Sequence, residues 1–379
     1  MRLQKEQTNT SSFKKLIVPI AAILFVGYAL WVPVSSGVVP GKHSVVAAVA
    51  YILWSMLILV LFVRTFSTRL RTVIARLFAV LLTLLVLAAA VFGLYMFNKG
   101  LSTLDSIATV ENAVTVDTAQ SFNIFISGID TYGDIGSMSR SDVNIVATVN
   151  PNTHKILLTT APRDSYVSIA MGGNDGMDKL THAGIYGPQA SMATMARLLS
   201  TDIDAYMRIN FTSFIESIDT LGGITLQNPT TFTIDGVTFP EGELQLDGKK
   251  ALLYSRERKS LAAGDIDRGK NQQRVIQGVV DKMAGIRTLG EFDTVLSLIG
   301  SNIDTNMSQE TIRSLVSKQL ESPSGWTTES ITLTGKGQTG GLPSYAMPDA
   351  QLYMYVLDQS SVDDAARRIA ELQKDIPKN

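Results

Sequence analysis

Carboxylates and arginines are grouped at five places in the second part of the chain, where they could bind a charged ligand. The groups are Gly128-Ile129-Asp130, Ser139-Arg140-Ser141-Asp142, Ala161-Pro162-Arg163-Asp164, Tyr254-Ser255-Arg256-Glu257-Arg258, and Gly264-Asp265-Ile266-Asp267-Arg268 with Asn271 and Gln272. Asp130 follows an apolar run, so a loop should project it from the edge of a sheet. Arg140 and Asp142 are two residues apart where a strand begins, and therefore face the same side.

The last group opens the longest helix expected outside the amino-terminal region, residues 268–286. Its apolar stripe consists of Val275, Ile276, Val279, Val280 and Met283. At about 100° per residue, Arg268 and Gln272 continue that stripe at the amino end. A buried guanidinium is costly unless it is paired. Its partner is either a structural carboxylate, Asp265 or Asp267, or an anionic ligand, which a helix amino terminus also favours.

Five arginines at strand or helix ends strengthen the ligand hypothesis. The planar fork of arginine suits phosphate oxygens, and two or three neighbouring carboxylates suit a hard divalent cation that bridges phosphates. Any single Arg–Asp pair is more often an ordinary salt bridge, and spacing alone does not establish that the five converge. The pattern is nevertheless typical of a phosphate site.

Two further patterns have weaker interpretations. Gly335-x-Gly337-x-x-Gly340 matches a dinucleotide fingerprint, but Pro343 follows and no helix is expected to open there, which argues against nucleotide binding. His43, His154 and His182 are scattered without metal-ligand spacing. His182 is as well explained as a loop hydrogen-bonding residue as by a functional role.

Charge and composition exclude several classes of function. Of 33 basic residues nine lie in residues 1–97, with only one of 34 acidic residues, so residues 98–379 carry a formal net charge of −9. Such an acidic domain is a poor match to duplex DNA, and no nucleic-acid partner is expected. The absence of cysteine from the sequence rules out disulfides, thiolate catalysis and Cys-ligated metal sites.

Three uncharged apolar runs occupy the amino-terminal quarter: about 16–32, 43–63 and 77–97. Each is long enough to predict a transmembrane helix, although a cleaved signal peptide is the alternative for the first. Basic residues concentrate in the amino tail and in the 64–76 loop. The positive-inside rule then predicts a multi-pass cell-membrane protein with a cytoplasmic amino terminus and an extracellular domain on the cell-wall side.

Strands and helices alternate after a connector at 98–121. Expected strands are Phe122–Ser127, Val143–Val149, Lys155–Thr160, Tyr206–Asn210, Ile224–Gln227 and Thr230–Phe239. Expected helices begin at Pro188, then cover Phe211–Leu221, Asp247–Tyr254, Arg268–Ile286, Glu291–Ile299, Gln309–Leu320 and Val362–Leu372. The predicted fold is α/β: three transmembrane helices (residues 1–97), then an extracytoplasmic α-β-α sandwich with a central mixed sheet (residues 122–379).

Several of these segments together resemble the LytR-CpsA-Psr family. They are Phe122–Asp130, Ser139–Asp142, Pro162–Asp164, Lys179–Ala183, Leu221–Ile224 and Tyr254–Val275. The resemblance covers roughly residues 120–285, and with the apolar runs it is greatest to the CpsA proteins of streptococcal capsule operons. Those relatives usually carry an accessory domain before the catalytic domain. The roughly 24 residues available here are too few for one.

The resemblance implies a role for each matched residue. Asp130 and Asp142 would hold Mg²⁺ or Mn²⁺ against a pyrophosphate, and Asp142, Arg140 and Arg268 would act in catalysis. The pyrophosphate oxygens would be bound by Arg140, Arg163, Arg256, Arg258, Arg268, Gln272 and Lys179. An apolar pocket between the sheet and helices would bind a polyprenyl tail.

The implied activity is a phosphotransferase that moves capsular polysaccharide or a related glycopolymer from an undecaprenyl (pyro)phosphate carrier to peptidoglycan. Other capsule-assembly membrane proteins are further expected partners. The alternative is a membrane-bound regulator of capsule synthesis that binds partners or lipid-linked polymer without catalysis. The charged residues favour the enzyme, because a scaffold has no use for a charged cleft.

Overall fold

The computed structural model divides the chain into two compact units. It describes residues 2–35, 41–64, 78, 80–95, 98, 113–133, 135, 138–285, 303–321 and 325–375. The first unit comprises Met1–Ser102 and Val316–Glu321, and the second comprises Thr103–Leu315 and Ser322–Asn379. The predicted helix at 291–299 and most of the connector at 98–121 lie outside the described residues.

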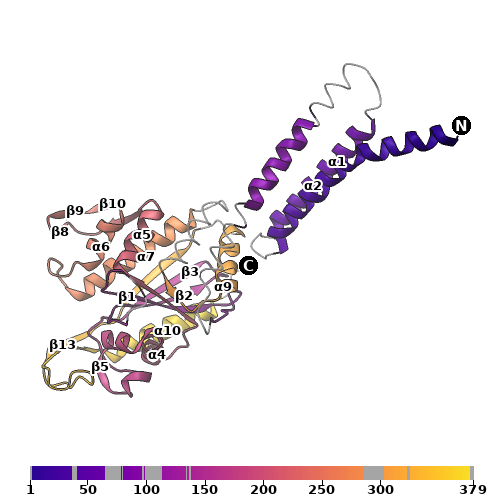
Figure 1. The fold of residues 1–379 in the computed structure, drawn as a ribbon. Helices are drawn as coiled ribbons and strands as arrows, with labels where there is room; N and C mark the ends of the chain where they lie inside the picture. Colours follow the sequence, from indigo (N-terminus) through magenta and orange to yellow (C-terminus); the bar gives the residue numbers. More distant parts are fainter. Residues whose placement is uncertain are drawn as a thin grey trace. The chain divides into compact units, whose positions relative to one another are not determined.

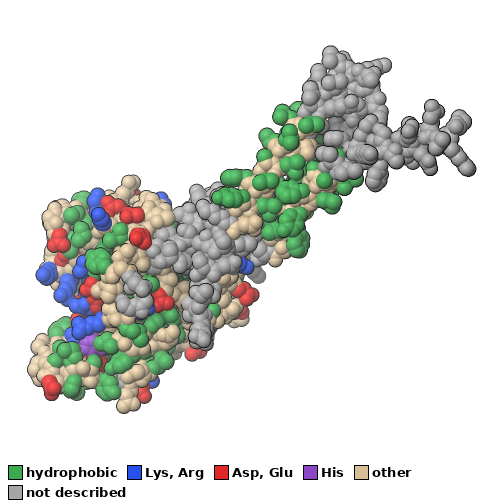
Figure 2. All heavy atoms as spheres, viewed as in Figure 1, with side chains coloured by type: hydrophobic (Ala, Val, Ile, Leu, Met, Phe, Trp, Pro, Cys, Tyr) green, Lys and Arg blue, Asp and Glu red, His purple; other side chains and the backbone are tan. Residues whose placement is uncertain are grey.

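The first unit is helical. Its helix α1 (Arg2–Ser35) contacts α2 (Gly41–Arg64), where the Tyr51 hydroxyl donates to the carbonyl oxygen of Ile23 at 2.9 Å. A further helical stretch covers residues 80–95. Figure 2 shows hydrophobic side chains over much of the described surface of this unit.

The prediction of three transmembrane helices at 16–32, 43–63 and 77–97 is wrong. Within the described residues, no helix combines the length and the apolar character that crossing a membrane requires. These two properties must coincide in one helix, and α1, for example, owes much of its length to a polar first half that includes Lys14 and Lys15. The predicted multi-pass membrane localisation depended on these three helices and is therefore also wrong. The predicted orientation of the chain across the membrane depended on them as well and no longer has support.

The second unit is built on a six-stranded mixed sheet, ordered β11-β6-β1-β2-β3-β12. The strands are β1 (Phe122–Ile129), β2 (Ser141–Asn150), β3 (Lys155–Thr160), β6 (Ala205–Asn210), β11 (Asp304–Thr305) and β12 (Thr327–Thr332). β1 runs parallel to β6 and antiparallel to β2, while β3 runs parallel to β12. The α/β class with a central mixed sheet is therefore confirmed.

Helices cover both faces of this sheet (Figure 1). One face carries α4 (Pro188–Leu199) and α10 (Gln359–Lys374), and the other carries α5 (Phe211–Thr220), α6 (Gly248–Arg256) and α7 (Asp265–Ala284). On the α4 and α10 side, Phe125, Val146 and Met195 belong to one buried apolar cluster. On the α7 side, Ile145 and Leu158 pack with Ile276.

Short elements complete the second unit. They are β4 (Tyr166–Ser168), β5 (Met177–Lys179), β7 (Ile224–Asn228), β8 (Phe232–Ile234), β9 (Val237–Phe239), β10 (Gly242–Leu246), β13 (Gly335–Thr339), β14 (Tyr353–Leu357), the short 3-10 helices η1 (Met171–Gly173) and η2 (Leu180–Tyr186), and the part of α9 (Gln309–Glu321) that ends at Leu315. The run predicted as one strand at 230–239 is the hairpin of β8 and β9, because Asp235 and Gly236 turn the chain with positive φ angles.

Candidate active site

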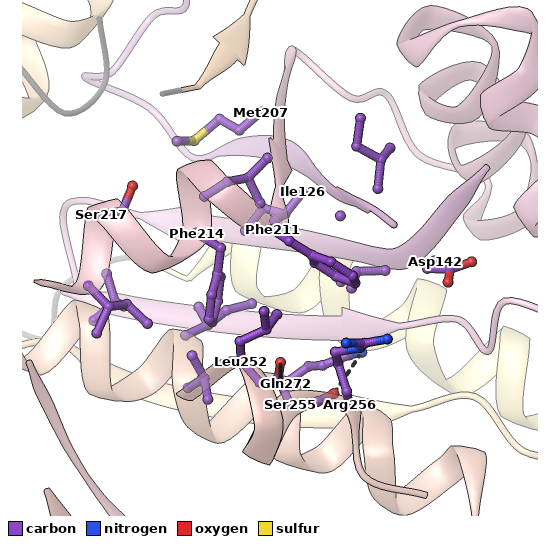
Figure 3. A pocket seen from close by; sticks show the side chains of 18 of the residues that line it. Ile126, Asp142, Met207, Phe211, Phe214, Ser217, Leu252, Ser255, Arg256 and Gln272 are labelled. Carbon is purple, nitrogen blue, oxygen red and sulfur yellow. Dashed lines mark hydrogen bonds between the residues drawn. The ribbon is translucent and has the colours of Figure 1, made fainter. Parts of the chain in front are cut away.

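A cavity of about 430 Å³ lies on the α5, α6 and α7 side of the sheet. At one end it is lined by charged and amide side chains: Asp130, Asp142, Arg163, Arg256, Arg258, Arg268 and Gln272. The remainder is lined mainly by apolar side chains, including Ile126, Val143, Met207, Phe211, Phe214, Leu252, Val275, Ile276 and Val279. Figure 3 shows Asp142 and Arg256 toward one side, with Phe214 and Leu252 farther from Asp142. We call these two parts the charged end and the apolar end.

The charged end is formed where secondary-structure elements begin or stop. Asp130 directly follows β1, Asp142 is the second residue of β2, and Arg163 follows β3. Arg256 is the last residue of α6, and Arg268 lies in the first turn of α7. Residues at these positions reach the rim of the sheet, where a charged side chain can meet both solvent and a ligand.

Asp142 has partners on both carboxylate oxygens. Nη1 of Arg163 donates to its Oδ2 at 2.8 Å, and Oγ1 of Thr181 donates to its Oδ1 at 3.2 Å. Burial lowers the pKa of Arg163, but the neighbouring Asp142 and Asp164 outweigh it, so the pKa is raised overall. Arg163 therefore stays positively charged at the cavity.

Arg268 faces the cavity and also contacts a carboxylate. Its Nη2 lies 2.5 Å from Oδ1 of Asp265, and its side chain is 10% exposed. Burial lowers the pKa of Arg268 and raises that of Asp265, in each case against the attraction of the partner. The pair thus compensates only part of the cost of burying two charges. The sequence left two partners open for Arg268, a structural carboxylate or an anionic ligand. In the structure Arg268 pairs with the carboxylate of Asp265 and also lines the cavity where a ligand could bind.

Two guanidinium N–H groups at the charged end lack hydrogen-bond partners. Nε of Arg163 and Nε of Arg268 are shielded from solvent, and neither is hydrogen-bonded to any described residue, although Nε of Arg163 lies 3.8 Å from Oδ2 of Asp164, at ion-pair distance. A buried donor without an acceptor costs roughly 1–3 kcal/mol, and more when the group is charged. Because both side chains line one cavity, an anion with several oxygens would satisfy them.

Arg256 and Gln272 lie where the charged end meets the apolar end. The guanidinium carbon of Arg256 is 4.5 Å from the centroid of the Phe211 ring, a cation–π arrangement. Nε2 of Gln272 donates to the carbonyl oxygen of Ser255 at 3.4 Å, which joins α7 to α6 (Figure 3). The Phe211 ring therefore contacts the guanidinium of Arg256 and also lines the cavity.

Two predicted site residues are not among those that line the cavity. Arg140 is exposed directly before β2, and Lys179 donates through Nζ to Oδ1 of Asp164 at 2.8 Å. Sequence analysis missed Thr181 as a partner of Asp142. It also missed Asp164 as the carboxylate shared by Arg163, at 3.8 Å, and Lys179. The sequence signal for these contacts was adjacency: Asp164 directly follows Arg163, and Thr181 lies two residues after Lys179.

A family model, LytR_cpsA_psr, matches residues 91–369. The chain belongs to the LytR-CpsA-Psr family. It is 30% identical over 296 residues to the polyisoprenyl-teichoic acid–peptidoglycan teichoic acid transferase TagU of Bacillus subtilis strain 168, an alignment that covers 76% of this chain and 92% of that protein. The resemblance that the charged motifs predicted is confirmed.

Solved structures agree with this assignment. The crystal structure of B. subtilis TagU is 29% identical with a TM-score of 0.53, covering 69% of this chain and 100% of that one. A structure of TagT bound to LIIa-WTA is 26% identical with a TM-score of 0.54, covering 70% and 98%. The second unit thus has a LytR-CpsA-Psr fold.

The magnesium site implied by LytR-CpsA-Psr membership has two candidate ligands in this chain, Asp130 and Asp142. Over the described parts of the chain, no group of three or more His, Asp or Glu residues is placed to hold a metal ion. Mg²⁺ is nevertheless often bound by only one or two carboxylates together with substrate phosphates. Two carboxylates lining one cavity with arginines fit that mode, and their assignment as ligands remains a prediction.

The remaining sequence hypotheses have structural counterparts as well. The Gly335-x-Gly337-x-x-Gly340 segment forms β13, which pairs antiparallel with β14, so no helix follows the glycines as a dinucleotide site requires. His182 is buried, with Nδ1 2.8 Å from Oδ1 of Asp178. That contact confirms its interpretation as a hydrogen-bonding residue.

Proposed function

We propose that this protein transfers a glycopolymer from a polyprenyl pyrophosphate carrier to peptidoglycan. Its relatives named TagU are polyisoprenyl-teichoic acid–peptidoglycan transferases. The observation that carries the proposal is one cavity with guanidinium N–H groups that make no hydrogen bond at its charged end and an apolar lining beyond them. That combination matches an amphiphile with a phosphate head and a hydrocarbon tail.

Each end of the cavity acts on a different part of the donor. Arg163 and Arg268 would bind the pyrophosphate oxygens through Nε–H groups that make no hydrogen bond in the structure, and Arg256 and Arg258 add positive charge to the cavity lining. Valine, isoleucine and phenylalanine side chains would bury the polyprenyl tail and exclude water. Fixing both parts aligns the phosphorus atom for attack, so catalysis rests on positioning and charge neutralisation.

The proposed reaction balances without a nucleotide. The acceptor hydroxyl oxygen forms a bond to the polymer-side phosphorus, while the bond from that phosphorus to the bridging oxygen breaks. Polyprenyl monophosphate leaves, and the hydroxyl proton is released. The arginines stabilise the negative charge that develops on the leaving phosphate. The pyrophosphate itself supplies the activation.

A divalent cation fits this scheme as a cofactor. Asp130 and Asp142 would hold Mg²⁺ or Mn²⁺ together with the donor phosphates. When bound, the ion would supply additional neutralisation of phosphate charge. In the structure Asp142 is held by Arg163 and Thr181, which fixes the carboxylate at the cavity wall.

We propose capsular polysaccharide or a related glycopolymer as the polymer. The motifs together with the amino-terminal apolar runs resemble the CpsA proteins of capsule operons, while the relatives named TagU are teichoic acid transferases. A competition assay with lipid-linked capsular polysaccharide and lipid-linked teichoic acid distinguishes the two. Faster transfer of the capsular donor supports the proposal, and exclusive use of teichoic acid contradicts it.

The activity test uses the full chain, a polyprenyl-pyrophosphate-linked polymer and soluble peptidoglycan strands. Mass spectrometry should detect polyprenyl monophosphate and a polymer–peptidoglycan phosphodiester in equal amounts. Donor binding without either product would instead favour the regulator that binds lipid-linked polymer without catalysis.

A further inference from the structure

Asp142 and Val143 are consecutive residues of β2, yet both line the cavity. In a regular strand, neighbouring side chains point to opposite faces of the sheet. Val143 and Ile145 pack with Ile276 of α7, on the cavity side of the sheet. Regular alternation from Val143 would therefore place the Asp142 side chain on the α4 and α10 side, away from the cavity.

A β-bulge in β2 accounts for the direction of Asp142. Gly128 of β1 pairs with Val143, but the next residue of β1, Ile129, pairs with Ser141, so Asp142 is left without a partner on β1. One extra residue in a strand shifts the alternation by one and re-aims a side chain. Ser141 thus takes the place on the α4 and α10 side that Asp142 would otherwise occupy, and Asp142 lines the cavity.

A buried hydrogen-bond network spans this bulge. Nδ2 of Asn144 donates to the carbonyl oxygen of Ser141 at 2.9 Å, and Oδ1 of Asn144 accepts from the Ser141 hydroxyl at 2.8 Å. The hydroxyl oxygen of Ser127, on β1, lies 2.7 Å from that of Ser141. Asn144 therefore ties the strand after the bulge to the residue before it, and Ser127 ties the bulged strand to its neighbour.

The network replaces apolar side chains in the core. Ser127, Ser141 and Asn144 are each at most 1% exposed, on the face where Phe125 and Val146 belong to an apolar cluster. Apolar residues of similar shape would stabilise this part of the sheet about as well as a hydrogen-bonded polar set. What a fully hydrogen-bonded buried network adds is one fixed local geometry. Here that geometry is the bulge.

The 3-10 helix η2 packs against the same stretch of β2. A Cβ atom on Gly184 would lie 2.6 Å from the amide nitrogen of Ser141, so the two backbones approach closely there. From the same helix, Thr181 donates to the Asp142 carboxylate. The bulge thus sets the direction of the Asp142 side chain, and Thr181 together with Arg163 then fixes its carboxylate.

We propose that Asn144, Ser141 and Ser127 are positioning residues, whose hydrogen bonds hold the bulge that turns Asp142 into the cavity. This inference rests on the proposed transferase function and names the residues that direct a proposed metal ligand. The competing explanation is a purely structural role, in which the network stabilises the fold and the bulge forms without it.

The first test measures the direction of residue 142 without turnover. The chain has no cysteine, so Asp142→Cys and Val143→Cys each introduce a single thiol. In the full chain both thiols should react with a small thiol reagent, because both positions line the cavity. Adding Asn144→Leu should slow the reaction at position 142 about tenfold, as for a thiol that becomes buried, and leave the rate at position 143 nearly unchanged.

Asn150→Leu is the matched control. Asn150 is also a buried residue of β2, but its Nδ2 donates to the carbonyl oxygens of Leu372 and Asp375 at the other end of the strand. This variant should lower the melting temperature and leave both labelling rates unchanged. An unchanged rate at position 142 in the folded Asn144→Leu chain would overturn the proposal.

A milder variant covers the case in which Asn144→Leu fails to fold. Ser127→Ala combined with Ser141→Ala keeps nearly the same buried volume and removes both hydroxyls. It should slow labelling at position 142 about fivefold, the equivalent of one net hydrogen bond. An unchanged rate in this pair would refute the proposal.

A double-mutant cycle connects the bulge to the site. Asn144→Leu should weaken Mn²⁺ binding in the presence of inorganic pyrophosphate about tenfold to hundredfold, the range for groups that orient metal-ligating carboxylates. In the Asp142→Ala background it should have almost no further effect, and equal effects in both backgrounds would show that Asn144 does not act through Asp142. Failure of the wild type to bind Mn²⁺ or to transfer polymer would count against the proposed function, while the labelling rates still decide the role of the network.

Discussion

The charged and apolar ends of the cavity share one helix but satisfy their side chains in different ways. From α7, Arg268 and Gln272 line the charged end, while Val275, Ile276 and Val279 line the apolar end on the same helical stripe. The charged residues lie in the first turns of the helix, where its amino terminus favours anions. One helix face therefore provides both parts of an amphiphile site.

The two ends also differ in what each lacks without a ligand. The charged end contains buried N–H groups of Arg163 and Arg268 that make no hydrogen bond to the described residues, whereas the apolar end leaves mainly apolar surface uncovered. Unpaired polar groups are costly and directional, and uncovered apolar surface is costly without direction. The charged end should accordingly determine which head group binds, and the apolar end how tightly it binds.

The largest effect is expected from Asp142→Ala at the charged end. Loss of this carboxylate frees Arg163 and removes a proposed metal ligand, so kcat/KM for transfer should fall about a thousandfold, ~4 kcal/mol. Transfer is measured by release of polyprenyl monophosphate. The matched control is Asp304→Ala, which breaks the ion pair of Asp304 with Arg208 (2.7 Å) on the same sheet. The control should lower the melting temperature and retain transfer, whereas near-normal transfer by Asp142→Ala would refute its role.

A smaller effect is expected from filling the apolar end with Ile276→Phe. The added ring should displace roughly four methylene groups of the lipid tail, which corresponds to about 3 kcal/mol of donor binding, or roughly a hundredfold in Kd. Inorganic pyrophosphate should bind the variant as it binds the wild type. Ile203→Phe makes the same change beside the core on the α4 and α10 side, and should leave donor affinity unaltered. Equal donor affinity in the two variants would place the tail elsewhere.

A still smaller effect, on stability, is expected from pH at the segment that supports the charged end. Burial would raise the pKa of Asp178, but hydrogen bonds from His182, Ala346 and Ser344 lower it to about 2, from an ordinary value of 3.8. A carboxyl whose pKa is lower in the folded state stabilises the fold above pH 4, and this contribution is lost as the pH falls toward 2. The expected loss is about 2 kcal/mol of the free energy of unfolding.

Denaturant titrations of the wild type and Asp178→Asn between pH 6 and pH 2 measure this contribution. The gap in unfolding free energy between the two proteins should narrow as the pH falls below 4. Because Thr181 lies between Asp178 and His182 and contacts Asp142, the segment connects this stability to the charged end. A gap that stays constant down to pH 2 would show that the carboxylate of Asp178 does not act in this way.

Local patterns predicted much of the second unit and part of its site. The strand at 155–160 was predicted with its observed bounds, because an apolar run directly follows an Asn-Pro-Asn turn. The inward face of Arg268 followed from helical periodicity alone. The β13–β14 hairpin was missed because its first strand is rich in glycine. At Gly337 the residue that leaves no room for a side chain is Tyr353, sixteen residues later in the sequence.

The sequence did not show which charged side chains pair with one another in the folded chain. Whether Lys179 faces a ligand or Asp164 depends on how β5 is placed beside the end of β3, and no local spacing records that placement. Arg140 likewise shares a motif with Asp142, yet only Asp142 lines the cavity. The apolar runs near the amino terminus gave a wrong prediction of membrane spans, because run length and composition were taken as sufficient evidence of a spanning helix.

The most direct test of the central claim, that one cavity binds a phosphate head and a lipid tail together, is calorimetry of the full chain with three ligands. These are a polyprenyl pyrophosphate, the corresponding polyprenol, and inorganic pyrophosphate. The account predicts that the polyprenyl pyrophosphate binds at least a hundredfold more tightly than either fragment, and that Arg268→Lys weakens it because lysine lacks the planar fork. Inorganic pyrophosphate binding as tightly as the complete lipid would contradict the account.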